Sequence, residues 1–245
     1  AMAGWRPIAE MQFEGFSYPA LDQVISHLAK YRERTRGRVG VPAVIRIPSF
    51  GGIKGKEHHG ESPETYYVHT AGLKVVVPSS PPDAYRLLRL SIDDPDPVIF
   101  LEPKSRYWSK ETGEPTVDGP GIGRARTVRD GGSCVVIAYG AMVTRCLEAA
   151  EVLSAEDIEV SVLDLRSLVP LDVEAIGEAV RATGRAVVVH EAPLTLGMGA
   201  EIVARIVEEA FDQLEAPVAR VTGPDVPYPP SVERISTTVR KVVSY

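Results

Sequence analysis

The alternation of short apolar runs with helical patterns restricts the fold of this chain more than any other feature of its sequence. The runs are rich in β-branched residues, and the segments between them repeat apolar residues at helical spacing. Strands are predicted at 8–13, 43–47, 73–78, 97–101, 134–138, 159–164, 186–190 and 217–222. Helices are predicted at 21–31, 83–91, 141–154, 172–182, 199–214 and 232–245. Because this alternation is typical of parallel sheets covered by helices, the sequence predicts an α/β fold with two parallel sheets.

An irregular stretch divides the two sets of elements. Residues 102–132 lack periodicity and are rich in Gly, Pro and charged residues, a composition typical of loops. We therefore expect two domains, at 1–104 and 133–245, joined by a linker over 105–132 that can hold one irregular strand. The proline-rich segment 223–230 is expected to be extended, because proline suits neither a helix interior nor a central strand.

Composition and charge narrow the function classes. The 245 residues are 44% hydrophobic and 24% charged, which is ordinary for a globular protein. A formal net charge of −6 argues against a broad basic face for nucleic acid. The sequence shows no apolar run long enough to span a bilayer and no signal peptide, so we expect no membrane partner. Cys134 and Cys146 lack metal-ligand spacing and are expected to be small core residues in a reducing compartment.

Two adjacent histidines, His58 and His59, mark the strongest candidate for a site. The chain has five histidines in all, and histidine is the side chain that titrates near neutral pH. A glycine-rich stretch precedes the pair, and Ser62, Pro63 and Glu64 follow it. Ser at the N-cap, Pro at the first helical position and an acid in the first turn predict a helix start. Because unpaired backbone N–H groups at such a start attract anions, the segment suits an anionic substrate.

Several stretches occur in an order and spacing that resemble one enzyme family. They are residues 7–13, 21–25, 29–32, 59–64, 72–78, 99–104, 162–168, 170–172 and 189–192. The chain resembles, over essentially its whole length, the β subunit of the E1 component of 2-oxoacid dehydrogenase complexes. These are thiamin-diphosphate-dependent decarboxylases that pass an acyl group to a lipoyl arm.

The resemblance implies a pyrimidine-binding thiamin diphosphate domain followed by a transketolase C-terminal-like domain. It also implies an α2β2 heterotetramer, with thiamin diphosphate held between an E1 α and a β subunit, and an E2 dihydrolipoyl acyltransferase as partner. In the family the α subunit binds Mg²⁺ and the diphosphate through a Gly-Asp-Gly motif, which this sequence lacks. The family's activating glutamate precedes the position of Ala1, so we expect an N-terminally incomplete first domain. The expected compartment is cytoplasmic in a bacterium and the mitochondrial matrix in a eukaryote.

The resemblance assigns roles to three residues of the first half. His59 aligns with the family's active-site histidine, which reaches the substrate and helps the acyl group pass to the lipoyl arm. Gln12 and Phe16 match positions that line the aminopyrimidine pocket. The family often has tyrosine at position 16, so Phe16 has lost a hydroxyl and is expected to stack rather than hydrogen-bond. His58 is expected to be a neighbouring or surface residue, and a loop histidine that caps a helix is the alternative for His59.

A monovalent-cation loop is also implied by the resemblance. Hard oxygen ligands suit a potassium ion. The implied ligands are the backbone carbonyls of Val41, Ala43 and Val44 and groups of Ser91, Asp94 and Asp96. The sequence alone allows a plainer interpretation, an acidic turn at 93–97.

The resemblance favours a branched-chain 2-oxoacid over pyruvate as the substrate. The alternatives are a pyruvate dehydrogenase E1 β subunit, a single-chain transketolase-like enzyme, and a non-catalytic subunit for assembly or E2 binding. The segment Gly197-Met198-Gly199 resembles a dinucleotide turn but lacks the third glycine, so we expect it to serve helix packing at a subunit contact instead.

Overall fold

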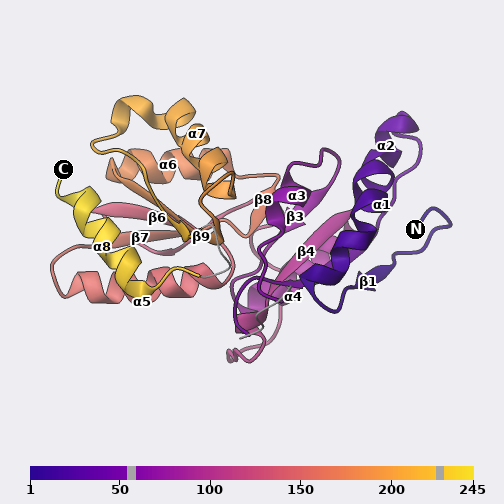
Figure 1. Ribbon diagram of the computed structural model, residues 1–245, viewed down its shortest axis with the longest axis horizontal. Coiled ribbons are helices and arrows are strands. Elements are labelled where there is room, and N and C mark those ends of the chain that lie inside the picture. Colours follow the sequence, from indigo (N-terminus) through magenta and orange to yellow (C-terminus); the bar gives the residue numbers. More distant parts are fainter. Residues whose placement is uncertain (54–58, 225–228) are drawn as a thin grey trace. The chain divides into compact units, whose positions relative to one another are not determined.

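Residues 1–53, 59–224 and 229–245, which the computed structural model describes, form two five-stranded sheets, each within its own unit of the chain (Figure 1). The first unit comprises Ala1–Gly123 and Ser167–Pro170. The second unit comprises Arg124–Arg166 and Leu171–Tyr245. The chain thus leaves the second unit once, over a short segment that belongs to the first.

The first sheet is parallel from β1 to β3 and ends in an antiparallel strand. Its order is β1 (Ile8–Glu10), β2 (Val44–Ser49), β4 (Val98–Pro103), β3 (Lys74–Val76) and β8 (Ser167–Val169). Strand β8 runs antiparallel to β3 and places Val169 opposite Val75. The neighbouring strands β2 and β4 align Val44 with Val98, and both are buried along almost their whole length. Continuous burial is expected of parallel strands that are covered on both faces.

Mostly short helices accompany the first sheet. They are η1 (3-10, Glu14–Ala20), α1 (Leu21–Ser26), η2 (3-10, Leu28–Lys30), α2 (Tyr31–Arg34), α3 (Glu64–Val68), α4 (Pro81–Asp93) and η3 (3-10, Lys104–Arg106). Helix α4 begins with two prolines, whose fixed φ suits a first turn. Its Leu87 lies in a buried apolar cluster with residues of three strands, so α4 covers that face of the sheet. These residues are Val44, Val76, Val98 and Phe100.

The second sheet is parallel from β10 to β7, and β5 runs antiparallel to β7. Its order is β10 (Ala219–Gly223), β9 (Ala186–Pro193), β6 (Cys134–Ala138), β7 (Val160–Asp164) and β5 (Arg126–Arg129). Its helices are α5 (Ala141–Ser154), α6 (Val173–Thr183), α7 (Met198–Ala210), the 3-10 turn η4 (Phe211–Gln213) and α8 (Val232–Val243). Helices α5 and α8 cover one face and α6 and α7 the other (Figure 1).

Most predicted elements are confirmed to within a few residues, and so is the α/β fold. The strand at 134–138 and the helix at 141–154 have the predicted bounds. Helix α6 begins where the Asp172 carboxylate accepts the Ala175 N–H at 3.2 Å, and it ends at Gly184 with φ 65°. These are the usual chemistries of an N-cap and a C-cap.

Two predicted elements of the first unit need correction, and a third element was not predicted. The strand at 8–13, which its apolar residues predict to be buried, spans only Ile8–Glu10 and is exposed, because β1 lies at the edge of its sheet. The helix predicted at 21–31 is divided at His27, whose φ of −119° departs from helical geometry. Strand β8 was not predicted, because three residues are too few to show a period.

Two predicted element ends also move. The helix start predicted at Ser62 lies one residue later, with Pro63 at the N-cap of α3 and no side-chain capping bond. Strand β2 continues through Pro48 instead of ending there. Backbone N–H groups two residues apart point to the same side of a strand, so the position of Pro48 faces the same side as the Val44 N–H, which bonds toward β1. Strand β1 ends opposite Arg46, so no strand residue lies opposite Pro48 to need its missing N–H.

Both cysteines are core residues, as predicted. Cys134 and Cys146 are buried and unbridged. Burial raises the pKa of the Cys134 thiol to about 12, so this thiol stays protonated near neutral pH and is a poor nucleophile. Across the described residues, we find no helix with both the length and the apolarity needed to cross a bilayer.

Candidate active site

The imidazole ring of His59 lies against two phenylalanines. Its centroid is 4.3 Å from the ring of Phe13, at an interplanar angle of 31°. The ring of Phe16 lies 5.8 Å away at 53°. Phe13 directly precedes η1 and Phe16 lies within it, so one short element supplies both rings. His58, the other half of the predicted pair, lies outside the described residues.

The segments at this site follow the carboxyl ends of adjacent parallel strands. Element η1 follows β1, Phe50 follows β2, and Lys104 follows β4. The N–H of Phe50 donates to the carbonyl of Glu61 at 2.8 Å, which holds the segment after His59 to the end of β2. The carboxyl edge of a parallel sheet is where α/β proteins commonly bind ligands. This edge is therefore the candidate active site.

A buried ion pair lies next to the His59 segment. Lys104 Nζ and Glu14 Oε2 are 2.7 Å apart, and their side chains are 2% and 0% exposed. The other carboxylate oxygen, Glu14 Oε1, accepts the backbone N–H of Glu61 at 2.8 Å. Lys104 Nζ also lies 5.9 Å from the centroid of the Phe13 ring. One carboxylate thus links η1, the end of β4 and the segment that carries His59.

Tyrosines connect η1 with helix α3. The Tyr67 hydroxyl donates to Ser17 Oγ at 2.9 Å in a buried contact. The rings of Tyr18 and Tyr66 meet edge to face at 6.0 Å. Burial, together with the charge of Glu61, raises the pKa of Tyr18 well above its usual 10, so this phenol stays neutral and keeps its proton.

The structure brings two of the three predicted site residues together. Phe16, which is 47% exposed, and His59 form one surface. Gln12 is exposed in the turn between β1 and η1. An open aromatic face beside an imidazole fits the stacking of a heteroaromatic ring, which is what an aminopyrimidine needs. The assignment of these residues to a cofactor stays a prediction.

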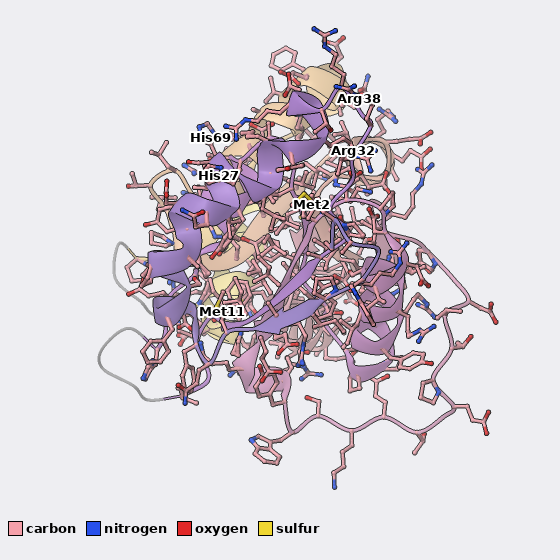
Figure 2. All side chains as sticks on the ribbon, turned by 90° about the vertical axis from the view of Figure 1, so that its right-hand side faces the viewer. Met2, Met11, His27, Arg32, Arg38 and His69 are labelled. Atoms are coloured by element: carbon pink, nitrogen blue, oxygen red, sulfur yellow. The ribbon has the colours of Figure 1, made fainter. Side chains whose placement is uncertain are left out.

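The other described histidines of the first unit lie elsewhere. In Figure 2, His27 and His69 lie well apart from Met11, the neighbour of Gln12. His190 belongs to the second unit. Among the described residues of the first unit, His59 is therefore the histidine of this edge.

Comparisons with known proteins match both halves of the chain. A model of the transketolase pyrimidine binding domain matches residues 1–109, and one of the transketolase C-terminal domain matches residues 123–239. A 3-methyl-2-oxobutanoate dehydrogenase subunit beta from Mycobacterium tuberculosis is 54% identical over 232 residues, which are 94% of this chain and 67% of that protein. The chain belongs to the family of 2-oxoacid dehydrogenase E1 β subunits.

Other E1 β subunits give the same result. A pyruvate dehydrogenase E1 component subunit beta from Leifsonia xyli is 47% identical, over 94% of this chain and 68% of that protein. A 2-oxoisovalerate dehydrogenase subunit beta from Pseudomonas aeruginosa is 42% identical, over 94% and 70%. The predicted family and the thiamin-diphosphate-dependent class are confirmed.

A solved structure supports the fold alone. It is described as a split gene transketolase, an inactive beta4 tetramer, and its TM-score with this E1 β subunit is 0.83 at 22% identity. The match covers 99% of this chain and 77% of that one. The predicted order of a pyrimidine-binding domain and a transketolase C-terminal domain is confirmed.

The carboxylates of the predicted potassium site are paired with cationic side chains. Lys74 Nζ lies 2.8 and 2.6 Å from the two carboxylate oxygens of Asp94. Asp96 pairs with Arg32 through its guanidinium. The Ala43 carbonyl accepts a sheet hydrogen bond of 2.9 Å. The negative charge of Asp94 and Asp96 is thus already compensated by these cationic side chains.

The remaining predicted cation ligands lie in or just before β2 and in α4. Val44 begins β2, Val41 lies three residues before it, and Ser91 in α4 donates its hydroxyl to the Leu87 carbonyl at 2.6 Å. Among the residues that the structure describes, no group of three or more His, Cys, Asp and Glu side chains is arranged to hold a metal ion. The cation site of this E1 β subunit stays a prediction.

The Gly197-Met198-Gly199 segment opens α7 and packs against His190. A Cβ atom on Gly199 would lie 2.5 Å from His190 Nε2, and one on Gly197 would lie 2.7 Å from Cε1 of the same ring. Glycines are therefore required for α7 to come so close to the ring, so the segment serves packing within the chain, and the predicted subunit contact stays a prediction. Burial lowers the pKa of His190 to about 4, so the ring is neutral near pH 7.

Sequence reasoning did not single out Glu14 or Lys104 as functional residues. Lys104 ends the 99–104 stretch that carries the family resemblance and directly follows a buried strand, so its position could have drawn attention. Glu14 offered no such signal, because an acid beside a strand end is ordinarily a surface residue. Its burial depends on Lys104, which lies 90 residues further along the chain.

Proposed function

We propose that this E1 β subunit takes part in the oxidative decarboxylation of branched-chain 2-oxoacids and in acyl transfer to the lipoyl group of an E2 dihydrolipoyl acyltransferase. The relative named for 3-methyl-2-oxobutanoate, a branched-chain 2-oxoacid, is 54% identical. The relative named for pyruvate is 47% identical, and it makes pyruvate the second candidate substrate.

The placement of His59 on Phe13, beside the open ring of Phe16, is the observation that carries the proposed chemistry. An imidazole that is positioned beside a substrate can serve as a general acid or base. A 2-oxoacid presents a carboxylate and a carbonyl, and both accept hydrogen bonds. We therefore assign to His59 the contact with the substrate and the delivery of a proton during acyl transfer.

Thiamin diphosphate, when bound, supplies the electron sink for decarboxylation. On this chain, Phe16 would stack on the aminopyrimidine and Gln12 would line its pocket. The E1 α subunit would hold the diphosphate and Mg²⁺. A potassium ion at Asp94 and Asp96 would first have to displace Lys74 or Arg32.

The proposed assembly is an α2β2 heterotetramer of two E1 α and two β subunits, with E2 as the acceptor of the acyl group. The proposed compartment is the cytoplasm of a bacterium, or the mitochondrial matrix of a eukaryote. We also propose domain limits of 1–104 and 133–245. The scarcity of regular structure between η3 and β5 supports a linker between them.

One assay tests the function and the substrate together. The full-length β subunit is assembled with its α subunit, thiamin diphosphate and Mg²⁺, and decarboxylation is followed with 2-oxoisovalerate and with pyruvate. We expect kcat/KM to be higher for 2-oxoisovalerate. A preference for pyruvate would refute the substrate assignment only, whereas activity with neither would refute the catalytic role.

A further inference from the structure

The buried carboxylate of Glu14 makes two bonds that matter for the geometry of the candidate site. Oε2 binds Lys104 Nζ at 2.7 Å, and Oε1 accepts the N–H of Glu61 at 2.8 Å. Glu61 lies two residues after His59 in the chain. Its carbonyl accepts the N–H of Phe50, so the backbone at Glu61 is held on both sides of the residue.

The same segment also fixes the ring that supports His59. Phe13 directly precedes Glu14, and its ring lies 4.3 Å from the imidazole. Displacement of Glu14 would therefore disturb His59 in two ways, through the ring beneath it and through the backbone after it. Lys104, at the end of β4, ties this arrangement to the sheet.

Stability alone is a weak reason to bury such a pair. Taking a carboxylate and an ammonium out of water costs several kcal/mol per ion, and apolar side chains of similar size are often as stabilising. The pair instead fixes the relative positions of the segments that it joins, because charge-assisted hydrogen bonds hold their partners at short and defined distances.

We propose that Glu14 and Lys104 are positioning residues that hold His59 in its working orientation. The proposal rests on the function proposed for His59. It assigns no contact with substrate or cofactor to either residue, and both act through the His59 segment.

A double-mutant cycle in the full-length, assembled E1 tests this role. Glu14→Gln keeps an acceptor for the Glu61 N–H but removes the charge that holds Lys104. Because a misplacement of about 1 Å can lower a rate about 10²-fold, we expect a loss of that order in kcat for acyl transfer, with KM little changed. In a His59→Ala background, Glu14→Gln should cause almost no further loss. Equal losses in both backgrounds would overturn the proposal.

A second experiment compares the loss of one buried charge with the loss of both. Lys104→Met leaves Glu14 buried without its cation, whereas Glu14→Gln with Lys104→Met leaves no buried charge at all. The double variant should recover part of the kcat that Lys104→Met loses. Losses that simply multiply would contradict the positioning role, because they would mean that the two residues act separately.

Amide hydrogen exchange at Glu61 supplies a readout that does not depend on activity. Glu14→Ala removes the acceptor and should speed exchange at this amide. Glu102→Gln is the matched control, because it neutralises a carboxylate two residues from Lys104 that pairs with Arg46 instead. Unchanged exchange at Glu61 in Glu14→Ala would overturn the inference. If His59→Ala leaves acyl transfer intact, the proposed function fails, and faster exchange would still establish Glu14 as the anchor of the segment.

Discussion

The two units differ in what fixes their side chains. In the second unit, helices α5, α6, α7 and α8 have 11 to 14 residues, and α5 and α8 share one large apolar cluster with the sheet. In the first unit, α1, α2 and α3 have 4 to 6 residues, and the candidate site depends on buried polar bonds. Helices of that length are marginal without tertiary contacts. We infer that apolar packing in the second unit supplies much of the stability, whereas buried polar bonds in the first unit set the geometry of the site.

The largest expected effect is on the site itself. His59→Ala in the assembled enzyme should lower the rate of lipoyl acylation by about 10²–10⁴-fold, which is the usual contribution of a positioned acid or base. The free energy of unfolding should hardly change, because the side chain is only half-buried. Stopped-flow acylation and urea denaturation measure the two quantities separately.

His69→Ala is the matched control for this prediction, since His69 is exposed and lies away from the site (Figure 2). Its acylation rate should equal that of the wild type. A large loss of stability in His59→Ala would break the comparison, because it would make the site a part of the folding core.

Periodicity in the sequence predicted the elements of the second unit better than those around the site. The run at 134–138 and the helix at 141–154 have their predicted bounds because each buries a continuous or helical face. Strand β1 and the divided helix at 21–34 depend instead on contacts with distant residues. Local patterns carry no information about such contacts.

The apolar core of the second unit provides the next largest effect. Leu153 in α5 is fully buried in the cluster that joins α5, α8 and the sheet. Leu153→Ala should lower the free energy of unfolding by about 2–5 kcal/mol, because it removes buried methyl groups and leaves a cavity. Val152→Ala changes the adjacent residue, which is 46% exposed, and should cost much less. Similar losses in both variants would show that the core is not what stabilises this unit.

A buried titratable group gives a smaller, pH-dependent effect. His190 has a pKa of about 4 in the folded protein because of burial, against 6.5 for a free histidine. Between these values the unfolded state binds the proton more tightly, so stability must fall as the pH is lowered from about 6.5 toward 4. The full loss from this group is about 3 kcal/mol.

The comparison of wild type with His190→Gln isolates this effect from the carboxylates that both proteins share. The difference in their free energies of unfolding should be constant above pH 7 and should move in favour of the variant as the pH falls below 6.5. A difference that does not vary with pH would show that His190 is not held neutral by its surroundings.

The candidate site was predictable from the sequence only where a side chain has distinctive chemistry. His59 drew attention as one of two adjacent histidines, and its ring lies near those of Phe13 and Phe16 at the carboxyl edge of the first sheet. Glu14 could not be found in this way, because its role depends on a cation that the chain brings back from another strand end. Residues that hold a site are thus harder to predict than residues that face a ligand.

The smallest expected effect concerns a single helix cap in the second unit. The Asp172 carboxylate accepts the N–H of Ala175 at 3.2 Å and that of Ala125 at 2.8 Å, so it caps α6 and also holds the segment before β5. Asp172→Ala should lower the free energy of unfolding by about 1–2 kcal/mol. Asp172→Asn keeps an oxygen acceptor and should lose less, which urea denaturation of the two variants can resolve. If Asp172→Ala also slowed acylation as strongly as His59→Ala, the separation between a stabilising second unit and a site set by the first would no longer hold.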